Sequence, residues 1–311
     1  MTRDLLRPRV LVLMATYNGM QWIDEQIQSI IVQEGVDIHL CISDDCSTDL
    51  TGVHIKNAYA NNSRVEIILN SSPSGSAGSN FQTLFRSVNT SSFNYISLAD
   101  QDDIWHPRKL IEAVKVLQSE GAKGYSGAVN AFFPSGKKVL LKQSNKLRSA
   151  DFLFEGAGQG CTFVVTSDMF DVIKNFCIRN RATVENFHYH DWLIYLITRA
   201  AGYKWCFDKR PWVLYRQHDK NEIGARAGMG AIAKRFELIK NGWYKRQINM
   251  AIKLAALVNP ENLLLSTIIS ELNGKSAIKR KLKLSKILFQ YGRRRLSDRA
   301  VLIYAAILGY I

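Results

Sequence analysis

Residues 94–110 read NYISLADQDDIWHPRKL, and this stretch decides the fold class. The short apolar run at 94–98 is bounded by polar residues, a pattern typical of a buried β-strand. It leads directly into the acidic cluster DQDD at 100–103, and Pro107 then stands where a helix can begin. We expect this helix to end near residue 118. A strand followed by a polar turn and a helix is one repeating unit of an α/β fold.

Three further units of this kind precede the acidic cluster. We expect strands at 9–14, 38–43 and 65–69, each followed by a helix, at 21–33, 48–59 and 81–88. Alternation at this spacing predicts a mainly parallel sheet with helices on both faces. Because ligands bind at the carboxyl ends of strands in such sheets, the polar clusters at 16–18, 44–45 and 100–103 are predicted to meet at one edge.

The rest of the chain is first irregular and then helical. We expect strands at 127–133, 138–141 and 162–166, a glycine-rich loop at 156–160, and helices at 190–200, 231–258, 261–272, 276–291 and 296–310. The change from strands and helices to helices alone predicts an α/β domain over residues 1–225, followed by a basic helical region over residues 226–311.

Positive charge is concentrated in that helical region. The net charge of +14 arises from 41 Lys and Arg against 27 Asp and Glu. From Lys220 onward there are 18 Lys and Arg against 5 Asp and Glu. Residues 1–219 hold the other 23 basic and 22 acidic residues and are therefore nearly neutral. Residues 276–291 interleave Ile and Leu with Lys and Arg, as in a basic amphipathic helix. A solvated helix surface needs no partner, but this pattern favours an anionic membrane surface over nucleic acid, with about 1 kcal/mol for each Lys or Arg near such a surface.

Composition excludes several classes of protein. With 47% hydrophobic and 22% charged residues, the chain is neither collagen-like nor wholly disordered. We find no secretory signal and no apolar stretch long enough to span a membrane. The 5 cysteines form no CxxC pair, which argues against a disulfide framework or a zinc site. We therefore expect a cytoplasmic protein that associates peripherally with the inner face of the cell membrane.

The acidic cluster is the strongest chemical signal. Asp100, Asp102 and Asp103 repel one another unless a cation compensates them. A solvated acidic loop is the simplest explanation, but the position after a buried strand favours Mg²⁺ or Mn²⁺ bound together with a nucleotide diphosphate. His188, His190 and His218 do not change this expectation, because a metal beside phosphates prefers oxygen ligands over a zinc-type site.

Other polar residues have a structural and a functional interpretation. Thr48 and Asp49 are expected to cap a helix, whereas Asp44 or Asp45 can accept a hydrogen bond from a pyrimidine ring. The segment 16–18 either borders a base and ribose or simply forms a turn.

Asp191, Arg216 and His218 also allow two interpretations. Asp191 stands at a predicted helix start, where the helix dipole keeps it ionised, and a carboxylate is suited to deprotonate an acceptor hydroxyl. It can equally be an ordinary N-terminal helix carboxylate. Arg216 and His218 can likewise be a surface pair.

Together these segments resemble the family 2 glycosyltransferases, which have the Rossmann-like GT-A fold. The resemblance covers about residues 9–225 and is closest to the bacterial rhamnosyltransferase-type branch. The matching segments are Ala15–Gly19, Asp44–Asp49, Leu98–Leu110, Gly160–Thr162, His190–Trp192 and Tyr215–His218, with Asn221 and Gly224. Two positions depart from the family pattern: Cys46 replaces a usual glycine, so the local turn is expected to differ, and Ala15 replaces a common proline.

The resemblance implies a role for each matching residue. The nucleotide-sugar site would comprise Thr16, Tyr17, Asn18, Asp44, Asp45, Asn80, Asp100, Gln101, Arg216 and His218. Asp102, Asp103 and His218 would hold Mg²⁺ or Mn²⁺, and Asp191 would be the general base. Asp44 or Asp45 would read the pyrimidine, while Arg216 and His218 would face the diphosphate.

The implied activity is an inverting transfer of a sugar, L-rhamnose from dTDP-rhamnose in this branch, to a polyprenyl-diphosphate-linked saccharide during O-antigen or capsule synthesis. A UDP-hexose-dependent transferase is the alternative within the family. A nucleotidyltransferase is less favoured, because residues 16–20 lack a glycine-rich loop bearing a cation. A binding module without catalysis would not need the acidic cluster.

Overall fold

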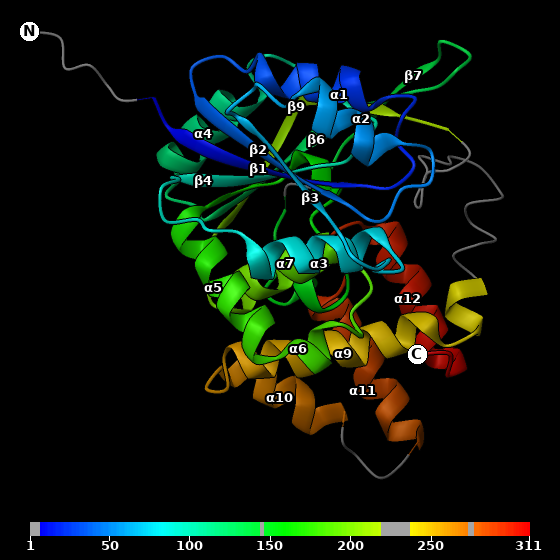
Figure 1. The fold of residues 1–311 in the computed structure, drawn as a ribbon. Helices are drawn as coiled ribbons and strands as arrows, with labels where there is room; N and C mark the ends of the chain where they lie inside the picture. The colour runs from blue at the N-terminus through cyan, green and yellow to red at the C-terminus, as the bar shows by residue number, and fades with distance from the viewer. Residues whose placement is uncertain (1–6, 144–145, 219–236, 273–276) are drawn as a thin grey trace, which may run out of the picture.

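The computed structural model describes residues 7–143, 146–218, 237–272 and 277–311 (Figure 1). Its strands are β1 (Arg9–Thr16), β2 (Asp37–Asp44), β3 (Val65–Leu69), β4 (Tyr95–Ala99), β5 (Ile104–Trp105), β6 (Gly124–Phe132), β7 (Lys138–Leu141), β8 (Val164–Thr166) and β9 (Trp205–Arg216). They form one sheet in the order β3-β2-β1-β4-β8-β6-β9-β5, and β7 pairs with β6. The strands β1 to β4 are parallel, as the sequence predicts, and β8 joins β4 to β6 in antiparallel register.

Helices cover both faces of this sheet (Figure 1). On one face lie α1 (Ile23–Ile31), α2 (Thr51–Ala58) and α4 (Lys109–Glu120), and on the other lie α3 (Ala77–Ser87), α5 (Ser167–Arg179), the short α6 (Arg181–Val184) and α7 (His190–Ala200). The alternation along β1 explains the two layers: Val10, Val12 and Met14 pack into one core, whereas Leu11 and Leu13 pack into the other. Both cores exclude water, so β1 is buried on each side.

Helices α9 (Trp243–Val258), α10 (Leu263–Leu272), α11 (Ala277–Tyr291) and α12 (Leu296–Leu308) extend the layer under α7 (Figure 1). Leu254, Leu288 and Ala306 from these helices belong to the same core cluster as Leu13 of β1. The C-terminal helices therefore continue the hydrophobic core of the α/β layers. The domain boundary predicted at residue 225 lies outside the described residues. No helix in the described part of the chain is long and apolar enough to cross a bilayer.

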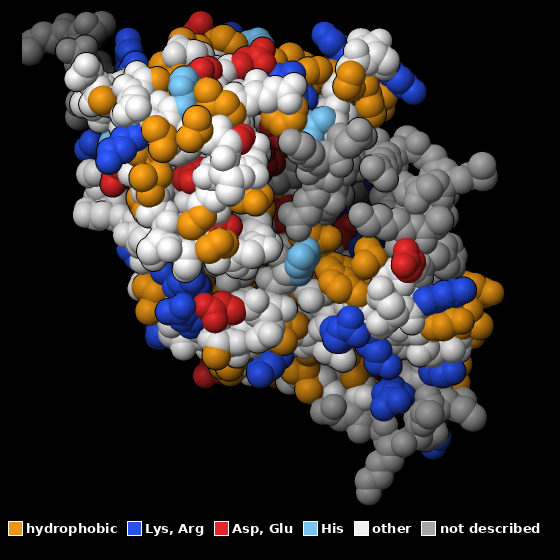
Figure 2. Space-filling view, turned by 45° about the vertical axis from the view of Figure 1, so that its right-hand side comes forward, with side chains coloured by type: hydrophobic (Ala, Val, Ile, Leu, Met, Phe, Trp, Pro, Cys, Tyr) orange, Lys and Arg blue, Asp and Glu red, His pale blue; other side chains and the backbone are white. Residues whose placement is uncertain are grey.

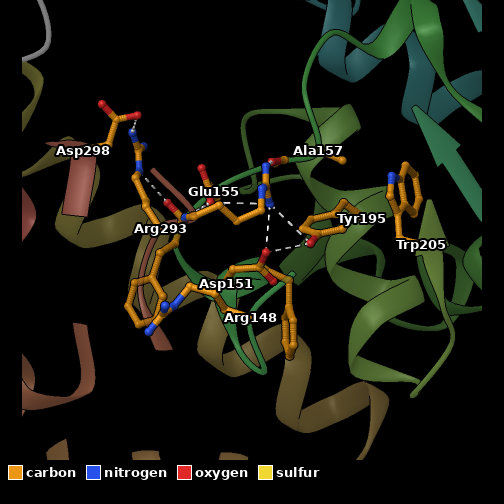
Figure 3. Close-up of polar contacts among 12 residues, drawn as sticks. Arg148, Asp151, Glu155, Ala157, Tyr195, Trp205, Arg293 and Asp298 are labelled. Carbon is orange, nitrogen blue, oxygen red and sulfur yellow. Dashed lines mark hydrogen bonds and ion pairs between the residues drawn. The ribbon is translucent and has the colours of Figure 1, made fainter. Parts of the chain in front are cut away.

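The half-buried Arg293 and the buried Arg294 link these helices to η1 (Asp151–Leu153) and the loop that follows it. Figure 3 labels Arg293, Asp151, Glu155 and Tyr195 of this group. The Arg294 guanidinium donates to Asp151 Oδ2 at 3.0 Å, to Tyr195 Oη at 3.3 Å and to the Gly156 carbonyl at 2.7 Å. The Arg294 and Asp151 side chains are 3% and 0% exposed, so this is a fully buried ion pair. Next to it, Arg293 Nε donates to the Phe154 carbonyl at 3.1 Å.

Three predictions about elements are corrected by the structure. The sequence analysis predicts no strand at 205–216, whereas the structure has β9 there; Pro211 and neighbouring charges are unusual in a strand interior. The strand β9 accommodates Pro211 at an irregularity in its register with β6, where 209–210 before Pro211 and Trp212 after it have no partner in the ladder. The helix α5 was also missed. The helix expected over 231–258 is interrupted at Gly242, which has φ of 71° and precedes α9; residues 231–236 lie outside the described residues.

Candidate active site

The carboxyl ends of β1, β2 and β4 lie side by side, which confirms the predicted convergence. Thr16 pairs in register with Asp44, and Met14 with Ala99. Gln101 joins the first and third of these strand ends, since its Oε1 accepts from Thr16 Oγ1 at 2.6 Å and from the Tyr17 amide at 2.8 Å. The Asp45 amide donates to the Thr16 carbonyl at 2.9 Å and completes the link to β2. The parallel sheet thus brings three segments distant in sequence to one edge.

The two acids at the end of β2 organise the loops around them. Asp44 Oδ2 accepts from the Ser47 amide at 3.0 Å. Asp45 Oδ1 accepts from the Ser74 amide at 2.7 Å, and its Oδ2 from Ser74 Oγ at 2.8 Å. Asn80 is buried and bonds through both side-chain atoms to Ser43. An ionised carboxylate accepts about four hydrogen bonds, so Asp44 and Asp45 retain capacity beyond these contacts.

The turn after Asp45 keeps a left-handed conformation although it lacks glycine. Cys46 has φ of 60°, and its thiol lies 3.2 Å from the Asn70 carbonyl. Asn18, with φ of 49°, faces this turn and accepts from the Thr48 amide at 2.8 Å. The substitution at Cys46 therefore changes the residue while the backbone keeps a conformation that favours glycine. The expected helix cap is wrong, because the N-cap of α2 is Leu50, whose side chain makes no capping hydrogen bond. Asp49 Oδ1 instead accepts from the amide of Thr51, the first residue of the helix, at 3.1 Å.

Asp103 lies deepest in the acidic cluster. Its Oδ1 accepts from the Arg216 amide at 3.1 Å, whereas Oδ2 is buried without a hydrogen-bond partner. Ligand atoms of Asp100, Asp103 and Cys161 all lie within 4.8 Å of one another. Burial raises the pKa of Asp103 well above its usual range, and the charges of Asp102 and Asp100 raise it further. A cation would relieve both the unpartnered oxygen and the repulsion.

A buried lysine lies behind this cluster. Lys109 is 1% exposed, and its Nζ donates to Ser97 Oγ at 3.0 Å and lies 3.2 Å from the centre of the Trp105 ring. Burial lowers the pKa of Lys109 to about 7, while Cys161 and Asp103 act in the opposite direction. Lys109 belongs to the matching segment at 98–110, but the sequence alone does not reveal that its side chain is buried.

Asp102 and His218 form the outer part of the site. Asp102 Oδ2 lies 2.6 Å from His218 Nε2, and the His218 ring stacks on Trp22 with 4.1 Å between centroids. Arg216 holds this arrangement together, because its Nε donates to the Asp102 carbonyl at 2.7 Å. The Arg216 guanidinium also pairs with Glu25 of α1. Asn221 and Gly224, the last residues of the matching motif, lie outside the described residues.

Asp191 stands in the first turn of α7, close to the acidic cluster. Its Oδ1 accepts from the Trp192 amide at 2.6 Å. A Cβ placed on Gly160 would lie 3.3 Å from Asp191 Cβ, so the two backbones are in close contact. Gly160 directly precedes Cys161, which belongs to the acidic cluster. The positive end of the α7 dipole favours an ionised carboxylate at this position.

The donor set fits a hard divalent cation. The buried carboxyl oxygens of Asp102 and Asp103 and the half-buried Asp100 supply the oxygen ligands that Mg²⁺ and Mn²⁺ prefer. Burial and the neighbouring acids raise the pKa of the Cys161 thiol well above its usual range. The three residues predicted to hold the metal fall into two places, with Asp102 beside His218 and Asp103 beside Cys161.

Sequence reasoning did not assign several residues of the site. Trp22 and Glu25 come from a helix whose apolar periodicity indicated only packing. Ser74 and Asn70 lie in a serine-rich loop that carried no motif, although they bind Asp45. Arg294 was counted only as part of the basic region. Each of these residues is identified by a contact with a segment distant in sequence, and such contacts are visible only in the folded structure.

Comparisons with known proteins agree with this geometry. The model of the family "Glycosyl transferase family 2" matches residues 11–187. A dTDP-rhamnosyl transferase, RfbG of Shigella flexneri, is 39% identical over 236 residues, which are 76% of this chain and 82% of that protein. The putative teichuronic acid biosynthesis glycosyltransferase TuaG of Bacillus subtilis is 22% identical over 69% of this chain and 90% of that protein.

Solved structures show the same fold at low sequence identity. The crystal structure of S. aureus TarS 1-349 superposes with a TM-score of 0.55 at 13% identity, over 97% of this chain and 88% of that chain. The crystal structure of the same protein in complex with UDP-GlcNAc superposes with a TM-score of 0.56 at 12% identity, over 97% of this chain and 89% of that chain. With a family model that matches more than half of its length and a relative of this identity, the chain belongs to glycosyl transferase family 2 and is a glycosyltransferase with a GT-A fold.

Proposed function

We propose that this glycosyltransferase transfers L-rhamnose from dTDP-rhamnose to a saccharide acceptor, with inversion at the anomeric carbon. The observation that carries the proposal is the meeting of Asp100, Asp102, Asp103 and His218 with the first turn of α7 at one sheet edge. The rhamnosyl donor is supported by the 39% identity to the Shigella dTDP-rhamnosyl transferase, which extends over 82% of that protein. UDP-hexose transfer is the competing outcome of the test below.

In this proposal the strand ends bind the donor. Thr16, Tyr17 and Asn18 border the nucleoside, and Asp44 or Asp45 accepts from the thymine imide. Asp100 and Gln101 lie where the β4 turn approaches the ribose, and Asn80 supports the wall through Ser43. The contacts with Gln101 and Ser74 hold the strand ends in place before the donor arrives, which lowers the ordering cost of binding.

The negative charge of the leaving diphosphate is balanced near Asp102, Asp103 and His218. Asp103 with Asp100, and Asp102 beside His218, would supply ligands to Mg²⁺ or Mn²⁺, and the bound cation would offset the negative charge of the leaving diphosphate. Arg216 fixes the backbone carbonyl of Asp102 and keeps His218 against it. Its own guanidinium pairs with Glu25, so its approach to a diphosphate requires exchange of that partner.

Asp191 acts as general base. It takes the proton of the attacking acceptor hydroxyl, while the bond from the anomeric carbon to the diphosphate breaks on the opposite face. One displacement without a covalent intermediate inverts the configuration. The α7 dipole keeps Asp191 ionised before the reaction and stabilises it again after the proton has passed on.

The acceptor in this proposal is a saccharide linked to polyprenyl diphosphate at the inner face of the cell membrane. The support is the surface of α11 and α12, where Leu282, Phe289, Leu296, Tyr304 and Ile307 are exposed between basic residues. In Figure 2, Lys and Arg side chains lie among hydrophobic ones over the lower, helical part of the molecule. Exposed apolar residues with surrounding cations are suited to the headgroup region of an anionic bilayer.

A panel of nucleotide sugars tests the donor. The purified chain is incubated with dTDP-rhamnose, UDP-glucose, UDP-galactose and UDP-GlcNAc, with and without Mn²⁺, and release of nucleoside diphosphate is measured. Turnover with dTDP-rhamnose alone supports the proposal, whereas turnover only with a UDP-hexose refutes the rhamnosyl donor. Asp191→Asn should reduce transfer by about 10² to 10⁴-fold and leave nucleotide affinity nearly unchanged. Retained turnover in this variant would remove Asp191 from the base role.

A further inference from the structure

We propose that residues 243–253 of α9, together with the segment before α7, form the acceptor subsite. In this subsite an aromatic platform of His188, Tyr189 and Trp243 carries the acceptor sugar. A cationic pocket around Arg246 and Lys253 takes the diphosphate to which that sugar is attached. The inference rests on the proposed function, because it names the acceptor of the same transfer reaction.

The platform consists of three rings in mutual contact. The rings of Tyr189 and Trp243 lie 5.5 Å apart at 65°, and those of His188 and Tyr189 lie 4.6 Å apart at 74°. His188 is exposed, while Tyr189 and Trp243 are each half-buried. Part of each of these two rings rests on the core and part faces outward. Such amphipathic rings supply rigid contact area with little loss of side-chain entropy, which suits the apolar face of a sugar ring.

The platform is placed directly beside the proposed base. Tyr189 is the residue before α7, and its carbonyl accepts from the Leu193 amide at 3.0 Å. Asp191 follows two residues later in the first turn of the same helix. The buried Gln247 of α9 accepts from the His188 amide at 3.2 Å and fixes α9 against this segment. A sugar on the platform is therefore held next to the carboxylate that deprotonates it.

A pocket continues from the platform along α9. Its volume is about 460 Å³, and Asn186, Arg246, Gln247, Asn249, Met250 and Lys253 line it. Arg246 follows Trp243 by three residues and therefore lies next to it on the helix surface. Lys253 is seven residues beyond Arg246, about 10 Å along the axis on the same face.

The lining of this pocket matches a diphosphate. Arg246 and Lys253 are exposed cations, and Asn186 and Asn249 add amide donors at the same opening. None of the pocket residues carries a negative charge. Arginine and lysine with amide donors are the usual partners of phosphate oxygens. The order along α9, first aromatic rings and then cations, corresponds to the order of sugar and diphosphate in a lipid-linked acceptor.

The test compares one saccharide acceptor in two chemical forms, attached to farnesyl diphosphate or presented as an octyl glycoside. The full-length chain and its variants are assayed with the donor that the panel identifies. Arg246→Gln/Lys253→Gln should raise KM for the diphosphate form by at least about tenfold, because each lost contact to a charged phosphate weakens binding about that much. KM for the octyl glycoside and for the donor should stay within about twofold. Lys240→Gln/Lys245→Gln, with the same charge change on exposed residues, is the matched control.

The platform is tested with both acceptor forms. Trp243→Leu should raise KM for each form without changing donor hydrolysis in the absence of acceptor, and Trp243→Phe should restore most of the loss. The inference would be overturned if all variants had the same KM values, or if the Arg246/Lys253 variant changed KM equally for the diphosphate form and the octyl glycoside. In either case transfer by the wild-type chain would still uphold the proposed function. Absence of any transfer by the wild-type chain would instead refute the proposed function itself.

Discussion

Replacement of Arg294 by methionine is expected to destabilise the protein severely. The Arg294→Met change removes the cation from a pair in which the Asp151 side chain is 0% exposed. It also removes the hydrogen bonds to Tyr195 and to the Gly156 carbonyl. Asp151 Oδ1 already lacks a hydrogen-bond partner, so in the described part of the chain the variant leaves the buried carboxylate with the hydrogen bond from Tyr195. The change also removes the cation that lies 3.5 Å from Glu155. Removing one partner of such a pair costs about 3–5 kcal/mol.

Urea unfolding followed by tryptophan fluorescence measures this cost, since the indole of Trp205 is buried in the same core. The matched control is Arg295→Met, because the neighbouring Arg295 is exposed and its replacement should change the free energy of unfolding by less than about 0.5 kcal/mol. The double variant Asp151→Leu/Arg294→Met removes both charges and should regain at least half of the loss.

Two results would refute this reasoning. One is an Arg294→Met variant within about 1 kcal/mol of the wild type, which would mean that water or a neighbouring cation compensates Asp151. The other is a double variant no more stable than the single one, which would assign the loss to packing of the arginine stem instead of its charge.

Three further predictions address the lysine behind the cluster, the left-handed turn and the membrane surface. Burial lowers the pKa of Lys109 to about 7, so between pH 7 and its ordinary value of 10.5 the unfolded chain binds a proton that the folded protein does not, and stability rises with pH. Lys109→Met should therefore reduce the slope of the unfolding free energy against pH by up to about 1.4 kcal/mol per pH unit between pH 7 and 10, as measured by urea titrations. Parallel curves for the variant and the wild type would count against this prediction. Cys46→Gly should preserve stability and donor KM, whereas Cys46→Val, which places a β-branched residue at φ of 60°, should cost about 1–3 kcal/mol in thermal unfolding; equal melting temperatures would contradict this. Exchange of Arg280, Lys283 and Lys286 for glutamine should weaken sedimentation with anionic liposomes by about 100-fold, at about 1 kcal/mol per charge, while the same exchange at Lys56, Lys137 and Lys138 should have little effect; equal losses would favour nonspecific attraction by net charge.

The parallel half of the sheet was predictable from sequence because each of its strands is a continuous apolar run that ends in polar residues. The strand at 9–14 is the clearest case, since burial on both faces leaves no polar interruption. The strand β9 escaped prediction because its Pro211 and charges belong to a register irregularity that only its pairing with β6 explains. The pattern of apolar residues predicts which positions are buried in a regular strand, but it does not predict a strand whose register is irregular.

The site was predictable to a similar extent and for a related reason. Asp44 and Asp100 follow parallel strands, so topology alone brings them together. The metal residues separate into two places because Asp103 turns inward to the Arg216 amide, a choice between neighbouring acids that spacing does not contain. The platform around Trp243 depends on packing of α9 against α7, which no local pattern encodes.

The pairing of Arg294 with Asp151 also has a consequence for biosynthesis. The two residues are 143 positions apart, so a ribosome adding about 5–20 residues per second makes the aspartate roughly 7–30 s before its arginine. The strands β8 and β9 are synthesised within that interval, and the nascent chain still lacks the cation that neutralises the buried acid at the start of the loop at 151–160. Maturation of the loop at 151–160, whose Gly160 lies beside Asp191, is therefore expected to wait until Arg294 has been synthesised.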